Sequence, residues 1–150
     1  MMNRLLTTVW IMLMFVFLWA CSTEELVSID GDYMVTFWER VGCLDSLSNF
    51  RRDLDSTGCI TNNNGKFCYN YTFSFIEGTS FAYDLRIDSN GLVSNEQGNG
   101  VFALINSHMM SYCTPQCDTI TFIPGANSLE LIFPADSING CGTYLKMESI

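Results

Sequence analysis

Hydrophobic and polar side chains alternate along most of the chain after residue 30, which is the period-two pattern of half-buried β-strands. The clearest run covers residues 67–75, where aromatic side chains line one face and polar side chains the other. Residues 81–88 alternate in the same way. An alternating run also covers residues 33–41, and weaker runs cover residues 101–107, 119–123, 129–133 and 143–148. The pattern predicts an all-β domain of seven or eight antiparallel strands.

Turn signals separate these runs and predict where the strands end. They are Glu77-Gly78, Asn90-Gly91, Asn99-Gly100, Pro124-Gly125 and Asn139-Gly140. Strict alternation also predicts the two faces of the first strand. One face is expected to carry Tyr33, Val35, Phe37 and Val41, and the other Thr36, Trp38 and Arg40.

One segment departs from the strand pattern. Its apolar residues recur at three- and four-residue spacing, and they are Leu44, Leu47, Phe50 and Leu54. Asp45 or Ser46 is a suitable N-cap, and Gly58 is placed to end a helix. The spacing predicts one short amphipathic helix after the first strand.

The first 20 residues have the layout of a bacterial lipoprotein signal peptide. A head with one basic residue, Arg4, precedes an uncharged apolar run over residues 5–20. That run is shorter than the ~20 residues that span a bilayer comfortably. Its end, Leu18-Trp19-Ala20-Cys21, resembles the lipobox, whose cysteine is acylated and becomes the new N-terminus. We therefore expect cleavage before Cys21, with an ordinary cleaved signal and an unmodified Cys21 thiol as the alternative.

The lipobox resemblance implies a lipid anchor on Cys21, palmitate included, followed by a linker over residues 21–28 and one domain over residues 29–150. Two or three acyl chains hold a protein stably at a membrane. No Asp lies beside Cys21, and Glu24-Glu25 resembles the tether signal of surface-displayed lipoproteins. We expect a location at the outer membrane of the cell envelope, on either face. The alternative for the two acids is that they only solvate the linker.

Charge narrows the classes of partner. The chain has 7 basic and 16 acidic residues, a formal net charge of −9, and loss of Arg4 with the signal peptide leaves −10. Nucleic-acid binding needs a basic footprint, so no nucleic-acid partner is expected. No polybasic segment lies near the anchor, so anionic lipid is not expected as an electrostatic partner.

Six cysteines remain after Cys21, and an even number in an exported domain predicts three disulfides among fifteen possible pairings. Cys59 and Cys68 flank a segment with a central Asn64-Gly65 turn signal, so we expect them to face each other across a hairpin. Cys113 and Cys117 would then close a small loop. Cys43 would pair with Cys141 and tie the two ends of the domain together.

Several short motifs together resemble those of bacterial lipocalin-like lipoproteins, which are small barrels behind a lipobox. They are Gly31-Asp32-Tyr33-Met34-Val35, Cys43-Leu44-Asp45, Leu129-Glu130-Leu131 and Cys141-Gly142-Thr143-Tyr144-Leu145-Lys146. Strand number and chain length alone favour a closed barrel or a sandwich. The resemblance implies a small antiparallel up-and-down β-barrel of lipocalin-like type.

In such a barrel the inward aromatic face either fills the core or lines a pocket for one apolar molecule. The ligand-binding candidates are Phe67, Tyr69, Tyr71, Phe73 and Phe75. An aromatic stripe is more often core than pocket. Inward hydroxyls of Tyr69, Tyr71 and Tyr83 would favour a pocket, because buried Tyr needs a partner.

The sequence offers little for catalysis or metal binding. His108 is the only histidine, and a zinc site with Cys113, Cys117 and a carboxylate is the alternative to a disulfide there. An exported cysteine pair is more often oxidised, so we favour the disulfide. No Gly-x-Ser-x-Gly motif is present, and no pair of the acids stands out as a glycosidase pair. We predict no catalytic residues, no metal and no cofactor.

Four tripeptides share one pattern: Asp first, Ser or Thr second, and an apolar residue or Thr third. This pattern resembles an O-glycosylation acceptor motif of some bacterial envelope proteins. The acceptors would be Ser46, Ser56, Thr119 and Ser137. The alternative is that Asp-Ser and Asp-Thr pairs simply begin turns and caps. Asn70 fits the N-glycosylation pattern but is predicted to lie within a strand, so it is discounted.

These features together predict a membrane-anchored lipoprotein with a lipocalin-like barrel that binds a small apolar or amphipathic ligand, or a protein partner on its loops. The alternative is a structural or protein-interaction lipoprotein of the envelope with a filled barrel and no ligand. An enzyme ranks third.

Overall fold

The structure is a computed structural model that describes residues 27–54, 57–62 and 65–150. The predicted signal peptide, Cys21, most of the predicted linker and Ser56 lie outside the described residues. In the described ranges, no helix is long and apolar enough to cross a membrane.

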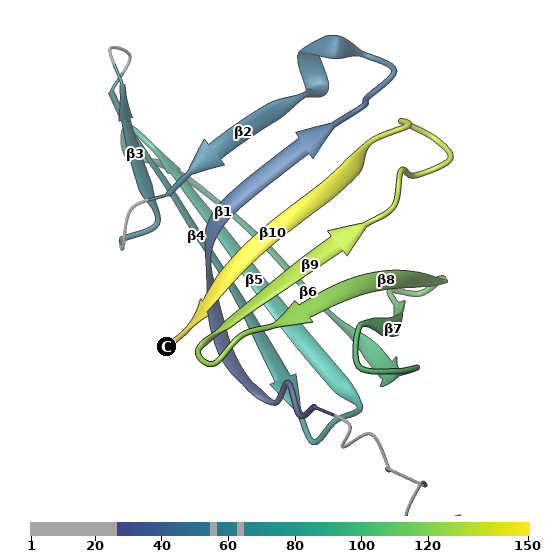
Figure 1. The fold of residues 1–150 in the computed structure, drawn as a ribbon. Coiled ribbons are helices and arrows are strands. Elements are labelled where there is room, and N and C mark those ends of the chain that lie inside the picture. The colour runs from purple at the N-terminus through teal and green to yellow at the C-terminus, as the bar shows by residue number, and fades with distance from the viewer. Residues whose placement is uncertain (1–26, 55–56, 63–64) are drawn as a thin grey trace, which may run out of the picture.

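Eight antiparallel strands close into a barrel (Figure 1). This confirms the predicted all-β class and, of the two architectures that strand number and length favoured, the barrel rather than the sandwich. Strands β4 to β10 neighbour one another in sequence order, and β1 pairs with both β10 and β4 to close the circle. Two short strands, β2 and β3, extend the sheet beyond the barrel. The bounds are β1 (Gly31–Val41), β2 (Phe50–Asp53), β3 (Cys59–Asn62), β4 (Gly65–Ile76), β5 (Ser80–Ser89), β6 (Leu92–Leu104), β7 (Met109–Cys113), β8 (Cys117–Pro124), β9 (Ser128–Phe133) and β10 (Gly142–Ser149).

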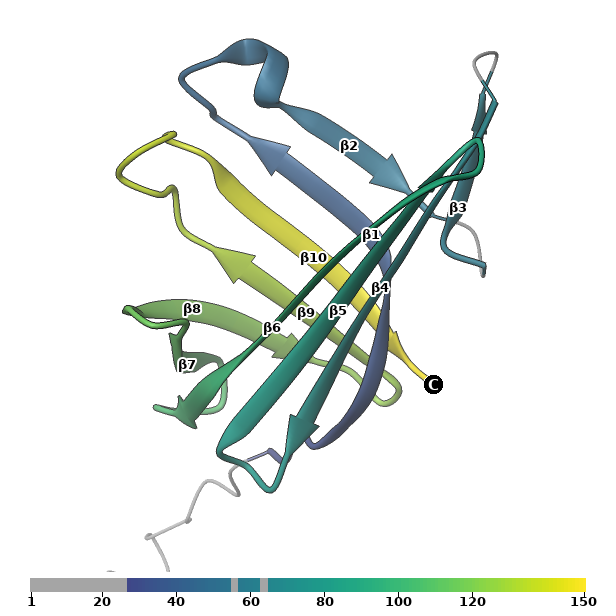
Figure 2. The ribbon, with the colours of Figure 1, turned by 180° about the vertical axis from the view of Figure 1, so that it is seen from behind.

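The barrel is closed at one end and opens at the other because β1 and β4 pair over only part of their length. Residues 31–34 of β1 pair with residues 72–75 of β4. Beyond them β1 pairs with β2 and β4 pairs with β3, so the two long strands diverge (Figure 2). We call the end flanked by β2 and β3 the mouth. The described chain begins at the opposite, closed end (Figure 1).

The core fills the closed half of the barrel with large apolar side chains that point inward from successive strands. The most buried are Val35, Phe73, Phe81, Met110, Ile120, Phe122, Leu129, Leu131, Leu145 and Met147. No polar or charged residue is buried among the described residues. Burial of this much apolar surface is the main source of the fold's stability.

The predicted helix after the first strand is wrong. The segment contains one 3-10 turn, Ser46–Ser48, capped by the Asp45 carboxylate, which accepts a hydrogen bond from the Leu47 N–H at 3.0 Å. Leu44 and Leu47 are 83% and 91% exposed, so no surface covers the apolar side that a helix would need to bury. Phe50 instead begins β2, which pairs with β1.

The predicted faces of β1 are wrong beyond its midpoint. The pairing of β1 with β10 shifts by one residue between Val35 and Phe37, which marks a β-bulge. A bulge reverses the alternation, because the extra residue moves every later side chain to the other face. Trp38 therefore lies on the inward side with Val35. Phe37 lies on the outer side and packs against Tyr144, with the ring centroids 5.6 Å apart.

Four of the five turn signals lie between strands as predicted, but Asn99-Gly100 lies inside β6. Asn90 and Gly91 both have positive φ, 53° and 88°, and connect β5 to β6. This is the conformation of a two-residue hairpin turn. Gly100 has a different role, because a Cβ there would lie 2.2 Å from the Cys113 carbonyl oxygen.

The three predicted disulfides are confirmed. Cys59–Cys68 joins β3 to β4 across their hairpin, and Cys113–Cys117 joins β7 to β8. Cys43–Cys141 connects the loop after β1 to the loop before β10 across a sequence separation of 98. The same two loops also share a backbone hydrogen bond from Leu44 N–H to the Asn139 carbonyl at 2.9 Å.

Candidate functional site

The predicted aromatic face of β4 lies in the barrel interior and runs from the closed end to the mouth. Phe73 and Phe75 are buried in the closed half, where Phe75 packs edge-on against Phe102 at 5.3 Å. Tyr69 is also buried, whereas Phe67 and Tyr71 are half-buried against the core. Phe73 and Phe75 are therefore part of the core. The three residues nearer the mouth, Phe67, Tyr69 and Tyr71, line the open half of the barrel.

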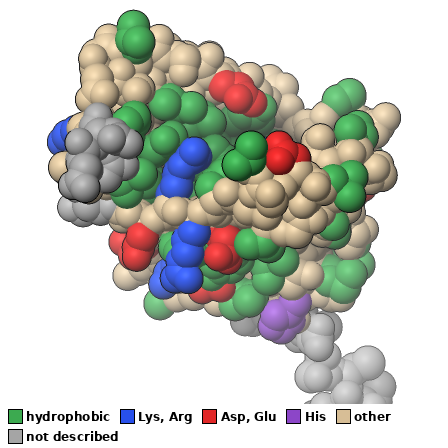
Figure 3. All heavy atoms as spheres, turned by 90° about the horizontal axis from the view of Figure 1, so that it is seen from above, with side chains coloured by type: hydrophobic (Ala, Val, Ile, Leu, Met, Phe, Trp, Pro, Cys, Tyr) green, Lys and Arg blue, Asp and Glu red, His purple; other side chains and the backbone are tan. Residues whose placement is uncertain are grey.

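Three residues that sequence reasoning missed complete the mouth. Trp38 points in from β1, and Phe50 and Arg52 come from β2. The Trp38 ring packs edge-on against Phe50, with the ring centroids 4.8 Å apart, and lies beside Tyr71, with the ring centroids 5.5 Å apart. Figure 3 looks down on the mouth and shows hydrophobic side chains gathered there, with a basic side chain among them. The bulge in β1 is what turns Trp38 into this position.

The Arg52 guanidinium is half-buried among these rings. Its central carbon lies 4.0 Å from the ring centroid of Phe50, 4.3 Å from that of Tyr69 and 4.9 Å from that of Trp38. Within the described part of the chain, no carboxylate forms an ion pair with it. Burial lowers the pKa of Arg52, yet a guanidinium stays charged at physiological pH. Its contacts are with ring faces, which accept no classical hydrogen bonds from its five N–H donors.

Tyrosine hydroxyls lie between the aromatic mouth and the apolar core. The ring centroids of Tyr71 and Tyr83 are 6.2 Å apart. The Tyr112 ring stacks on the Phe81 ring, with their centroids 4.3 Å apart. Burial raises the pKa of Tyr71 and of Tyr112. The Tyr83 hydroxyl donates to the Glu96 carboxylate at 3.5 Å, and burial followed by the Glu96 charge raises the pKa of Tyr83. These phenols are neutral hydrogen-bond donors at any physiological pH.

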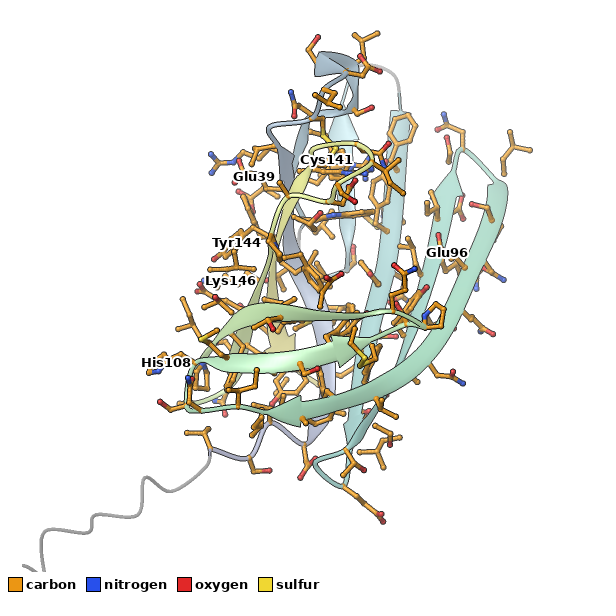
Figure 4. The ribbon with its side chains drawn as sticks, turned by 90° about the vertical axis from the view of Figure 1, so that its right-hand side faces the viewer. Glu39, Glu96, His108, Cys141, Tyr144 and Lys146 are labelled. Atoms are coloured by element: carbon orange, nitrogen blue, oxygen red, sulfur yellow. A yellow bond between two sulfur atoms is a disulfide. The ribbon has the colours of Figure 1, made fainter. Side chains whose placement is uncertain are left out.

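The side chains change from apolar to polar and charged along the barrel axis. This order suits an amphipathic molecule, which has one apolar end and one polar end. From the closed end toward the mouth, the apolar core is followed by the phenol hydroxyls and then by the aromatic rings that surround the Arg52 guanidinium. Glu96 lies on the β6 side of the barrel, away from Tyr144 and Lys146 of β10 (Figure 4). Tyr144 faces outward, where burial and its hydrogen bond to Glu130 raise its pKa to about 12.

The predicted zinc alternative does not form. Cys113 and Cys117 are bonded to each other, so neither offers a thiolate. His108 is exposed near the closed end, far from Cys141 at the other end (Figure 4), and its Nδ1 lies 2.8 Å from the Ser107 hydroxyl. In residues 27–54, 57–62 and 65–150, no group of three or more His, Cys, Asp or Glu could hold a metal ion.

The predicted glycosylation candidates within the described residues are exposed at the surface. Ser46 begins the 3-10 turn, Thr119 lies on β8, and Ser137 lies in the loop between β9 and β10. Asn70 is exposed on the outer face of β4. Asp45 and Asp136, which precede Ser46 and Ser137, each accept backbone hydrogen bonds in their turns. Both the acceptor interpretation and the turn interpretation stay predictions.

Comparisons with protein-family models, with curated proteins and with solved structures found no match. The resemblance to lipocalin-like lipoproteins therefore rests on the short motifs of this chain and on no relative.

Proposed function

We propose that this protein is a membrane-anchored lipoprotein whose lipocalin-like barrel binds a small amphipathic molecule with an anionic head group. The observation that carries the proposal is the Arg52 guanidinium, half-buried over three aromatic rings at the mouth. The head group would pair with Arg52, and the apolar part would cover the rings below it.

An anion is the natural partner because Arg52 is a partly desolvated cation. Burying a charge is costly unless it is paired and hydrogen-bonded. The chain carries sixteen acidic residues, yet none of those described forms an ion pair with this guanidinium. A carboxylate or phosphate that accepted two parallel N–H bonds from Arg52 would satisfy the charge, with the strength of charge-assisted pairs.

The apolar part of the ligand follows from the half-buried aromatic surface around Arg52. Trp38, Phe50 and Tyr71 each keep part of their surface open to solvent at the mouth. A chain laid across them would remove that surface from water and gain roughly 25 cal/mol per Å². The tyrosine hydroxyls deeper in the barrel would limit how far a purely apolar chain penetrates.

Trp38 fluorescence tests the proposal directly. The other two tryptophans, Trp10 and Trp19, precede the predicted cleavage site, so the mature protein would carry Trp38 alone. Titration of the mature protein with hexadecanoate should change the Trp38 emission saturably. Arg52→Gln should raise the Kd at least about tenfold, because a hydrogen bond to a charged group contributes roughly 1.5–3 kcal/mol.

Arg51 provides the matched control. It is the preceding residue of β2, is exposed, and lies over the outward Phe37 ring at 5.0 Å. Arg51→Gln removes the same charge from the same strand and should leave the Kd for hexadecanoate unchanged. Hexadecanol, which has no charge, should bind the parent and Arg52→Gln equally. Equal losses from the two arginine variants, or no saturable change with hexadecanoate, would exclude the proposal.

A structural or protein-interaction lipoprotein is the second candidate, and the loops beside the mouth favour it. Leu44, Leu47 and Ile138 are exposed on two loops that the Cys43–Cys141 disulfide joins. Exposed apolar clusters often mark interaction sites. Under this alternative, replacing the three side chains by Ser would abolish partner binding. Titration with hexadecanoate would then leave the Trp38 emission unchanged in the parent and in every variant.

A further inference from the structure

The outer face of the barrel is hollowed where β4, β5 and β6 run side by side. The groove has a volume of about 540 Å³. The residues that line it are Thr72, Ser74, Ala82, Tyr83, Asp84, Gln97, Gly98 and Asn99. We propose that this groove is a binding site for a neutral saccharide. The site is separate from the mouth and does not depend on the function proposed for it.

The groove lies outside the barrel because its residues alternate with the inward ones. On β4, Thr72 and Ser74 flank the buried Phe73. Cross-strand pairing then sets two rows across the three strands. Thr72 lies opposite Asp84, and Asp84 lies opposite Gln97. Ser74, Ala82 and Asn99 form the second row in the same order.

Small residues in the middle of this face leave the space that a ligand could fill. Ala82 stands at the centre of its row, between the longer Asn99 and the short Ser74. Gly98 also borders the groove and has no side chain. An exposed sheet face usually carries long charged side chains, and this region carries short polar ones instead. The volume falls within the range of small-molecule sites, about 300–1,000 Å³.

The lining offers hydrogen-bond donors and acceptors in comparable number. The amides of Gln97 and Asn99 supply both, the hydroxyls of Thr72 and Ser74 supply both, and Asp84 accepts. The Gln97 side-chain amide donates to the Asp84 carboxylate at 3.0 Å, which holds both groups in place before any ligand arrives. Fixed groups of this kind suit a ligand whose hydroxyls are themselves donors and acceptors.

Charge excludes the other common ligand classes. Asp84 is the single charged residue of the lining, so a phosphate or carboxylate would meet repulsion and no cation. Tyr83 packs against the barrel core, and Ala82 is the one other lining residue with an apolar side chain, so a lipid chain would gain little there. A cation would find Asp84 as its one charged partner in the lining, and Asp84 already accepts a hydrogen bond from Gln97. A neutral molecule rich in hydroxyl groups is therefore the ligand class that fits this groove.

The test uses the full protein as isolated from its cells, and any detergent needed to keep it in solution has no sugar head group. Maltotriose, cellotriose and triacetylchitotriose are the probes, with binding measured by saturation-transfer NMR and by calorimetry. We expect at least one probe to bind, and Asp84→Ala and Gln97→Ala to weaken that binding at least tenfold. Ala82→Phe should abolish it by filling the groove from a half-buried position on the outer face.

Asn95→Ala is the matched control, because Asn95 lies on the same strand and the same face, one row beyond the groove. It should leave the Kd unchanged, and hexadecanoate binding should be the same in all four variants. Absence of binding by all three trisaccharides would overturn the proposal. So would equal weakening by Asn95→Ala and Asp84→Ala, or a preference for spermidine or glucose 6-phosphate over every neutral probe.

Discussion

At the scale of single residues, glycines explain how β6 packs beside large aromatic rings. Gly98 and Gly100 lie on the inward face of β6, opposite Tyr83 and Phe81 of β5. A Cβ at Gly98 would lie 2.5 Å from the Tyr83 ring. A Cβ at Gly100 would lie 2.6 Å from the Phe81 ring and closer still to a backbone oxygen. The missing side chains therefore make room for the aromatic rings of the neighbouring strand.

Gly100→Ala should destabilise the fold by about 2–3 kcal/mol. The clash with the Cys113 carbonyl oxygen cannot be relieved by a rotamer change, and overpacking of this kind costs roughly 1–3 kcal/mol. Urea unfolding followed by tyrosine fluorescence would measure the change. Asn99→Ala, the outward neighbour, should change stability by less than about 0.5 kcal/mol. Equal stability of the two variants would show that β6 can shift to accept a methyl group.

At the scale of elements, alternation and turn chemistry were sufficient to predict most of the strands, but not their closure into a barrel. The run from Phe67 to Phe75 became β4 because each inward aromatic finds a neighbour on β5. Asn90-Gly91 predicted a hairpin turn because both residues tolerate positive φ. Local patterns of this kind work where a strand is long, regular and buried on one face.

The mouth could not be predicted because it depends on long-range pairing. The bulge after Val35 leaves no mark in the sequence, yet it decides that Trp38 points inward. Phe50 and Arg52 alternate correctly for a strand, but four residues are too few to distinguish β2 from a helical turn. The aromatic candidates on β4 were therefore predictable, and the cation above them was not.

Disulfides offer a prediction at the same scale, because two of them close loops of very different length. In the chain-entropy description, a loop of 98 residues adds about 4.7 kcal/mol of stability and one of 4 residues about 2 kcal/mol. Replacing Cys43 and Cys141 by Ser should therefore lower the free energy of unfolding more than replacing Cys113 and Cys117.

Chemical denaturation of the two double variants would measure this difference, with the parent as reference. The Cys43–Cys141 variant should also exchange the amide hydrogens of Leu44 and Gly140 faster, because the disulfide joins the two loops in which they lie. A larger loss from the Cys113–Cys117 variant would contradict the prediction and would indicate that the β7–β8 hairpin depends on its crosslink.

At the scale of the whole molecule, the start of the described chain and the mouth lie at opposite ends of the barrel (Figure 1). The described chain enters at the closed end, where Ile29 is buried in the core (Figure 1). Any membrane attachment through residues that precede it would leave β2, β3 and Arg52 at the far end. A lipid-anchored form would therefore present its mouth away from the membrane, and the ligand would arrive from the aqueous phase.

The lipid anchor itself is tested by the intact mass of the protein purified from its native membrane. We expect a chain that begins at Cys21, carries two or three acyl chains and gains six hydrogens on reduction of its three disulfides. Cys21→Ser should block acylation and leave the protein unprocessed, because the signal cannot be cleaved at a lipobox without its cysteine. An unacylated parent that begins elsewhere would refute the anchor. The barrel would then be a free exported domain, and its mouth could meet a membrane as readily as the aqueous phase.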